Sequence, residues 1–285
     1  MNRDSVLKLQ DGRQLGYAIY GNKSGLPITY CHGAPGSRLE CHPDQSVLEA
    51  LNICLIVPDR PGYGLSMPSE RRSLLSWADD VQQLLDTLSI QDCGILGFSG
   101  GGPYAMACAY QLPERITHLG LVSCLAPFNN PHGTDGMNEQ SKALYGLALS
   151  DPATFEAQIK MLATDGEVLF QIMTGGLPPE DQAVISLEGI KTMYLENMHE
   201  ALRSGVDGIV SDMLIFPRDW CFSPSEIRCD TYLWQGGKDM NVPLHMGKWL
   251  AETIPSCDSF IIDDDAHFLL FTHWEEIFGK LLSKG

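Results

Sequence analysis

Long apolar runs and positive charge are both scarce in this 285-residue chain. No stretch approaches the 18 consecutive apolar residues of a membrane-spanning helix. The 19 lysines and arginines are outnumbered by 36 aspartates and glutamates, which gives a formal net charge of -17 at pH 7. Nucleic-acid backbones and anionic lipid surfaces would repel such a chain, so we expect no nucleic-acid partner and no membrane partner.

The sequence also lacks signs of disulfides, metal sites and nucleotide sites. Its nine cysteines form no Cys-x-x-Cys pair, and Cys31, Cys54, Cys93 and Cys108 lie in apolar segments, which is typical of buried thiols in a reducing compartment. The residues after Met1 include no apolar leader segment, so we expect a cytoplasmic protein. The histidines have no ligand spacing such as His-Glu-x-x-His, and neither Gly-x-Gly-x-x-Gly nor Gly-x4-Gly-Lys-Ser/Thr occurs. We therefore expect no metal and no bound nucleotide.

Short apolar, β-branched runs alternate with helical segments along most of the chain. This alternation is typical of an α/β fold with a mostly parallel, doubly wound sheet that helices cover on both faces. Two runs near the start, joined by an Asp-Gly turn, predict a hairpin at an antiparallel edge. We expect about eight strands in all. The predicted strands are residues 6–9, 15–20, 28–31, 53–57, 94–98, 118–123, 231–235 and 259–262.

Residues 125–225 interrupt this alternation with helix-like pieces, among them 153–162 and 182–202. We expect an inserted helical cap over 125–225, with the two parts of the α/β core at 1–124 and 226–285. Eight apolar side chains of the cap are candidates for a pocket lining, although most of them are expected to form the core of the cap. They are Phe155, Met161, Leu162, Phe170, Met173, Met193, Tyr194 and Phe216.

The most informative short stretch runs from Gly97 to Gly101 and reads Gly-Phe-Ser-Gly-Gly. A side chain at the tip of a sharp turn from strand to helix is held in a strained backbone conformation. The positions two before and two after it must be small for the turn to close. Gly97 and Gly101 meet that demand around Ser99, and a helix over 101–111 would aim its positive end at the serine. The stretch predicts that Ser99 is a nucleophile.

A serine nucleophile needs a base within hydrogen-bond reach and an acid that fixes the tautomer of that base. In parallel sheets such groups gather at the carboxyl ends of the strands. Asp239 follows the predicted strand at 231–235, and His267 follows the one at 259–262. We therefore predict Asp239 as the acid and His267 as the base.

Each of these two residues has competitors in the sequence. Asp263, Asp264 and Asp265 are nearer to His267 along the chain, but charge runs at strand ends are mostly solvated. His273 lies within 268–282, which is interpreted as the last helix, where a histidine usually lies on the surface or packs. The glycine-rich turn before Asp239 suits the acid better than the aspartate run does.

The order Ser99, Asp239, His267 in these contexts resembles the α/β-hydrolase superfamily, and the resemblance covers nearly the whole chain outside the cap. It implies a serine hydrolase whose oxyanion hole is formed by the backbone amides of Ala34 and Gly100. His32 and the segment 59–66 are interpreted as structural, the segment as a tight turn with polar caps. The motifs are His-Gly-Ala-Pro-Gly at 32–36, Asp-Arg-Pro-Gly-Tyr-Gly-Leu-Ser at 59–66, Gly-Phe-Ser-Gly-Gly at 97–101 and Gly-x-x-Asp-x-x-x-Pro at 236–243.

The resemblance implies acyl transfer without a cofactor, and we expect a carboxylesterase-like enzyme that acts on small or medium esters. Lactonase, carbon-carbon bond hydrolase and non-catalytic ligand receptor remain open as alternatives. So does a proline iminopeptidase, because the layout is similar. In that family, however, Asp-Gln-Arg-Gly and Gly-Gly-Ser-Trp-Gly stand where this chain has Asp-Arg-Pro-Gly and Gly-Phe-Ser-Gly-Gly. A peptidase would also need cap carboxylates for the substrate amine, and the candidates are Glu167, Glu188, Glu196 and Glu200.

Overall fold

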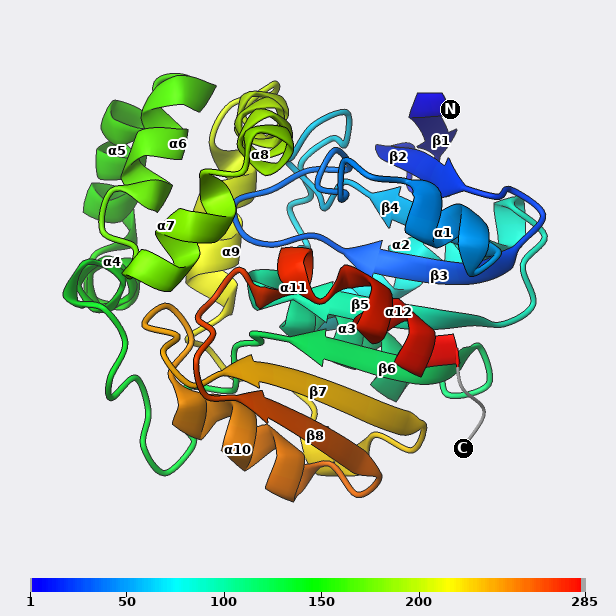
Figure 1. Ribbon diagram of the computed structural model, residues 1–285. Helices are drawn as coiled ribbons and strands as arrows, with labels where there is room; N and C mark the ends of the chain where they lie inside the picture. Colours follow the sequence, from blue (N-terminus) through cyan, green and yellow to red (C-terminus); the bar gives the residue numbers. More distant parts are fainter. Residues whose placement is uncertain (1, 283–285) are drawn as a thin grey trace.

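Eight strands form one sheet in the computed structural model, which describes residues 2–282 (Figure 1). The strand order across the sheet is β1-β2-β4-β3-β5-β6-β7-β8. β1 and β2 form the predicted antiparallel hairpin, and β2 also pairs antiparallel with β4, whereas all other neighbours are parallel. The bounds are β1 Asn2–Lys8, β2 Gln14–Gly21, β3 Leu26–Cys31, β4 Ile53–Pro58, β5 Cys93–Phe98, β6 Ile116–Val122, β7 Asp230–Gly236 and β8 Cys257–Ile262.

Helices cover both faces of this sheet, as the alternating pattern predicts. One buried apolar cluster joins the sheet to α1, α11 and α12, and a second joins the opposite face to α2, α3 and α10. β4 and β5 are buried at every position, which explains why they read as continuous apolar runs. The covering helices are α1 Ser46–Ala50, α2 Leu74–Thr87, α3 Gly102–Gln111, α10 Leu244–Thr253, α11 Leu269–Thr272 and α12 Trp274–Leu282, with the 3-10 turns η1 Ser99–Gly101 and η2 Pro224–Glu226.

Six helices are inserted between β6 and β7, and Figure 1 shows them gathered beyond one end of the parallel strands. The sequence predicts one helix over 182–202, but the chain turns at Ser186 and Leu187, where the backbone of Leu187 is extended. Residues on both sides of this turn are apolar and buried, so the periodicity continues through it and conceals the break. The inserted helices are α4 Glu139–Ser150, α5 Pro152–Leu162, α6 Gly166–Thr174, α7 Pro179–Ile185, α8 Glu188–Ala201 and α9 Asp207–Ile215.

The last helix also divides in two, because His273 stands between α11 and α12. All nine cysteines are unpaired, and six of them are buried. Within residues 2–282, no helix has the length and apolar character needed to cross a membrane.

Candidate active site

Ser99 lies at the sharp turn between β5 and α3. Its φ of 52° is in the left-handed region that side chains rarely adopt, as expected for a strained turn. The neighbouring glycines make this turn possible. A Cβ on Gly101 would overlap the carbonyl oxygen of Cys31, and a Cβ on Gly97 would lie 2.6 Å from the Cα of Gly102. The requirement for small residues on both sides of Ser99 is therefore confirmed by the packing.

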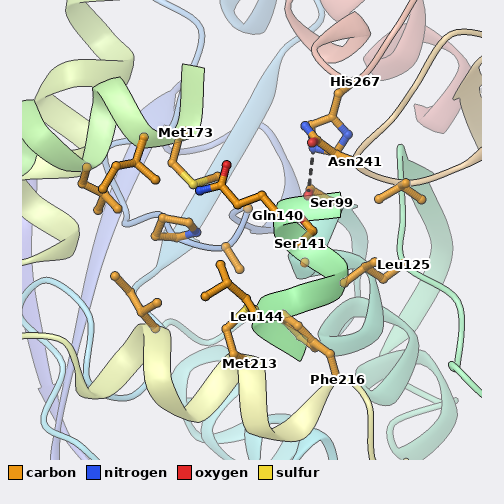
Figure 2. Close-up of a pocket in the computed structure, with 18 of the residues that line it drawn as sticks. Ser99, Leu125, Gln140, Ser141, Leu144, Met173, Met213, Phe216, Asn241 and His267 are labelled. Carbon is orange, nitrogen blue, oxygen red and sulfur yellow. Dashed lines mark hydrogen bonds between the residues drawn. The ribbon is translucent and has the colours of Figure 1, made fainter. Parts of the chain in front are cut away.

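His267 and Asp239 converge on Ser99 from the ends of β8 and β7. His267 Nε2 lies 2.9 Å from Ser99 Oγ, and His267 Nδ1 lies 2.9 Å from Asp239 Oδ2. Figure 2 shows the imidazole directed at the serine hydroxyl. The three residues thus have the spacing of a nucleophile, a base and an orienting acid.

The Asp239 carboxylate is held in place by the turn that carries it. Its Oδ1 accepts hydrogen bonds from the backbone amides of Asn241 and Val242, both at 2.8 Å, and its Oδ2 also accepts one from Gln235 at 3.2 Å. These donors fix the carboxylate so that Oδ2 faces the imidazole. Burial by itself would lower the pKa of His267, but the carboxylates of Asp239, Asp181 and Glu40, with Asp239 contributing most, together outweigh burial, so the net pKa lies above its ordinary value.

The competing residues do not reach the nucleophile. His273 Nε2 pairs with Asp265 Oδ2 at 2.7 Å, and His273 Nδ1 lies 3.2 Å from Glu276. Asp264 is on the surface, where it forms an ion pair with Lys238. The solvated character expected of the aspartate run is therefore confirmed for Asp264, whereas Asp265 is tied to His273.

Ala34 and Gly100 lie side by side next to Ser99. A Cβ on Gly100 would be only 2.6 Å from the Cβ of Ala34, and both residues line the same pocket as Ser99 and His267. The two residues named for the oxyanion hole are therefore neighbours beside the nucleophile, and the role of their backbone amides stays a prediction.

Buried polar groups support the loop that carries Ala34. His32 Nδ1 lies 2.8 Å from the Gly33 carbonyl, and its Nε2 accepts the backbone N–H of Arg60 at 3.2 Å. Burial, reinforced by the neighbouring Arg60, lowers the pKa of His32 far below its ordinary value, so the ring is neutral. The structural interpretation of His32 is thus confirmed. In the segment 59–66, Ser66 Oγ donates to the Asp59 carbonyl at 2.7 Å, which confirms the polar cap expected there.

Three supporting residues, Glu40, Asn197 and Asp212, were missed from the sequence. The guanidinium of Arg60 donates to the carbonyls of His32 and Gly33 and to Asp212 of α9. Glu40 accepts the Gly33 N–H at 2.6 Å and is also hydrogen-bonded to Asn197 of α8. Nothing in the local sequence indicates that Arg60 of the core pairs with Asp212 of an inserted helix. Arg60 itself lies within the segment 59–66, which the sequence marks as structural.

The pocket above Ser99 has a volume of about 140 Å³ and is enclosed mostly by apolar side chains of the inserted helices (Figure 2). Among the described residues, no lysine or arginine lines it, and Glu40 is the one acidic residue that does. Of the eight expected cap residues, Leu162, Met173, Tyr194 and Phe216 line it. The other four are not among the lining residues: Met161 is 79% exposed, and Phe155, Phe170 and Met193 are buried elsewhere among the inserted helices. The further apolar lining residues are Ala34, Pro35, Phe98, Leu125, Leu144, Ile159, Ala163, Leu169, Ile172, Ile209, Met213, Val242 and Phe268.

The glutamates Glu167, Glu188, Glu196 and Glu200 do not line this pocket. Glu200 instead forms ion pairs with Arg38 and Arg203. In the described part of the chain, no three His, Cys, Asp or Glu side chains gather as metal ligands would.

With this geometry and fold, the chain belongs to the α/β hydrolase fold family, whose model matches residues 27–273. The pimeloyl-[acyl-carrier protein] methyl ester esterase of Chromobacterium violaceum is 23% identical over 239 residues, or 82% of this chain and 84% of that protein. The uncharacterized hydrolase YcgS of Bacillus subtilis is 32% identical over 115 residues, or 40% of this chain and 39% of that protein. Several curated relatives are matched over only 39% to 58% of their length. A solved structure, a bromoperoxidase from Bacillus anthracis, superposes with a TM-score of 0.76 at 22% identity, covering 99% of this chain and 100% of that one.

Proposed function

We propose that this protein is a serine hydrolase that cleaves small or medium esters through an acyl-enzyme. The observation that carries the proposal is the Ser99, His267 and Asp239 arrangement, with both hydrogen-bond distances at 2.9 Å. Its position under an apolar pocket supports a carbonyl substrate with a hydrocarbon acyl group. The similarity to a methyl ester esterase along most of both chains supports the same class of bond.

The proposed reaction has two stages. Ser99 Oγ attacks the ester carbonyl while His267 Nε2 takes its proton, and the Asp239 carboxylate stabilises the imidazolium. The Ala34 and Gly100 amides would receive the oxyanion, a contribution of about 3 kcal/mol per donor. Collapse of the intermediate expels the alcohol, which receives the proton from His267. Water, deprotonated by His267, then attacks the acyl-enzyme and releases the acid and Ser99.

Hydrolysis of p-nitrophenyl butyrate by wild type and Ser99→Ala tests this proposal. Loss of the nucleophile is expected to reduce turnover by about 10⁶-fold. Proline p-nitroanilide serves as the comparison substrate for the peptidase alternative. Preference for the amide would favour the peptidase, whereas ligand binding without turnover that depends on Ser99 would favour the receptor. A lactone panel separates a lactonase from an open-chain esterase.

The charges around the pocket narrow the substrate class. A carboxylate on the acyl chain would find no lysine or arginine in the lining and would meet the Glu40 side chain instead. Burying such an unpaired charge is costly. We therefore propose an uncharged acyl group. This argues against carbon-carbon bond hydrolysis of carboxylate-bearing substrates on this chain.

Dimethyl suberate and monomethyl suberate differ only in one terminal charge and test the substrate class. We expect the diester to be hydrolysed at least about 100-fold faster, since an unpaired buried charge costs several kcal/mol. Leu162→Arg places a cation in the lining. It should therefore reduce the ratio of the diester rate to the monoester rate. Its matched control is Met161→Arg, which adds the same charge at the neighbouring exposed position outside the lining. Equal rates on both esters would refute the charge argument.

A further inference from the structure

One buried carboxylate in the inserted helices has no role in the proposed mechanism. Asp181 of α7 is only 1% exposed, and its Oδ1 accepts the backbone N–H of Phe268 at 2.7 Å. Its Oδ2 is also buried, yet it has no hydrogen-bond donor among the described residues. Phe268 directly follows His267, and α7 packs against α11. Asp181 is thus attached to the backbone of the segment that carries the base.

A buried carboxylate with one unpartnered oxygen is unfavourable unless a positive charge lies near it. No lysine or arginine side chain of the described residues is hydrogen-bonded to Asp181. The nearby Lys238 is instead paired with Glu180 and Asp264. Burial raises the pKa of the Asp181 carboxyl, and the charge of the His267 ring acts in the opposite direction. The positive charge available to Asp181 is therefore that of His267 when the ring is protonated.

Three carboxylates act on the His267 ring, each from a different part of the fold. Asp239, in the turn after β7, is in direct contact with it. Asp181 of α7 and Glu40 of the loop after β3 act through space, and all three favour the protonated ring against the opposing effect of burial. Ser99 is the uncharged group on the other side of the ring. Asp181 is the member of this set that belongs to the inserted helices.

We propose that Asp181 is a positioning residue for the ester hydrolysis proposed above, which fixes the inserted helices onto the base-bearing segment and stabilises the His267 imidazolium. When Ser99 Oγ bonds to the carbonyl carbon, its proton moves to His267 Nε2 and the ring becomes positive. Asp181 then faces a full positive charge, and the charge disappears again when the proton passes to the leaving alkoxide. At this step the positive charge of the His267 ring stabilises Asp181 Oδ2, the oxygen that has no hydrogen-bond donor in the resting site.

Asp181→Asn tests this role because the amide oxygen can still accept the Phe268 N–H while the charge is removed. In Ser99→Ala protein, a histidine NMR titration reports the pKa of His267 without any need for turnover. We expect Asp181→Asn to lower that pKa by about one unit, equivalent to a tenfold change in the protonation equilibrium. In the active enzyme, kcat/KM rises with pH as His267 loses its proton. In Asp181→Asn this rise should move to lower pH, and the plateau of kcat/KM at higher pH should fall up to about tenfold. Glu180→Gln is the matched control, since it removes one charge from the same helix on the surface.

Either readout can overturn the inference. An unchanged His267 pKa in Asp181→Asn would refute the inference even if the plateau of kcat/KM falls. A purely structural role would lower kcat/KM without moving its pH dependence. If Asp181→Asn fails to fold, Asp181→Thr retains an acceptor for the Phe268 N–H and is measured in the same way. Absence of ester turnover in wild type would refute the proposed function, whereas the titration would still test the electrostatic coupling. The kinetic part rests on the proposed function, and the titration does not.

Discussion

Replacing Gly100 by alanine would press a new methyl group against Ala34, the other residue proposed for the oxyanion hole. The new Cβ would lie 2.6 Å from the Cβ of Ala34 and 3.0 Å from the ring of Phe216, whereas ordinary contacts begin at 3.4 Å. The backbone of Gly100 is outside the left-handed region, so alanine is strained there only by these contacts. The substitution therefore tests the spacing of the two amides.

The expected magnitude follows from this overlap. Relieving it requires Ala34 and Gly100 to separate by about 0.8 Å. This shift is larger than the width, about 0.4 Å, of the 2.7 to 3.1 Å range of distances at which an oxyanion donor works. Loss of one donor costs about 3 kcal/mol, so kcat should fall by about 10² to 10³-fold. Overpacking of this kind should lower the free energy of unfolding by about 1 to 3 kcal/mol, which leaves the protein folded.

The assay is p-nitrophenyl butyrate hydrolysis, normalised to the fraction of folded protein measured by thermal unfolding. Gly279→Ala in α12 is the matched control, because its Cβ would meet nothing within 4 Å, and full activity is expected. A folded Gly100→Ala variant that retains kcat within about threefold of wild type would refute the assignment of these amides.

Further predictions concern the acid, the buried ion pair, the base and the cysteines. Asp239→Asn should lower kcat by about 10⁴-fold while the fold is retained, as steady-state kinetics and circular dichroism would show. Asp212→Ala leaves the buried Arg60 unpaired and should cost about 3 to 5 kcal/mol in urea unfolding at pH 7. The Arg60 and Arg72 charges outweigh burial and lower the pKa of Asp212, so this stability should be lost as pH falls below about 3.8 towards the folded-state pKa. His267 has a raised pKa in the folded state, so His267→Gln should destabilise the protein more below pH 6.5 than at pH 9. Reductant should leave Tm unchanged, because all nine cysteines are unpaired.

The strands and the nucleophile turn could be predicted because their signals are local. β5 is buried at every position and therefore reads as an apolar run, and Gly97 is forced by its contacts with Gly102 and Ala105 at the start of α3. The strand ends that carry Asp239 and His267 could be placed at one edge of the sheet, since parallel strands share that edge. These parts of the site depend on short stretches of sequence and on a general rule of topology.

The contacts between the core and the inserted helices could not be predicted. Asp181 and Phe268 are 87 residues apart, and Arg60 and Asp212 are 152 apart. Nothing near an aspartate on a helix indicates which distant amide or guanidinium it will meet. The break between α7 and α8 was missed for a related reason, because Ile185 and Ile190 on either side are both buried and extend the apolar pattern across the turn.

The central claim is that His267 activates Ser99 as a nucleophile, and covalent trapping tests it most directly. The protein is incubated with diethyl p-nitrophenyl phosphate, and the modified peptide is identified by mass spectrometry. We expect one diethylphosphoryl group, located on Ser99, with no adduct in Ser99→Ala and a strongly slowed reaction in His267→Gln. Modification at another residue, or an unreactive wild-type protein with its fold intact, would contradict the account.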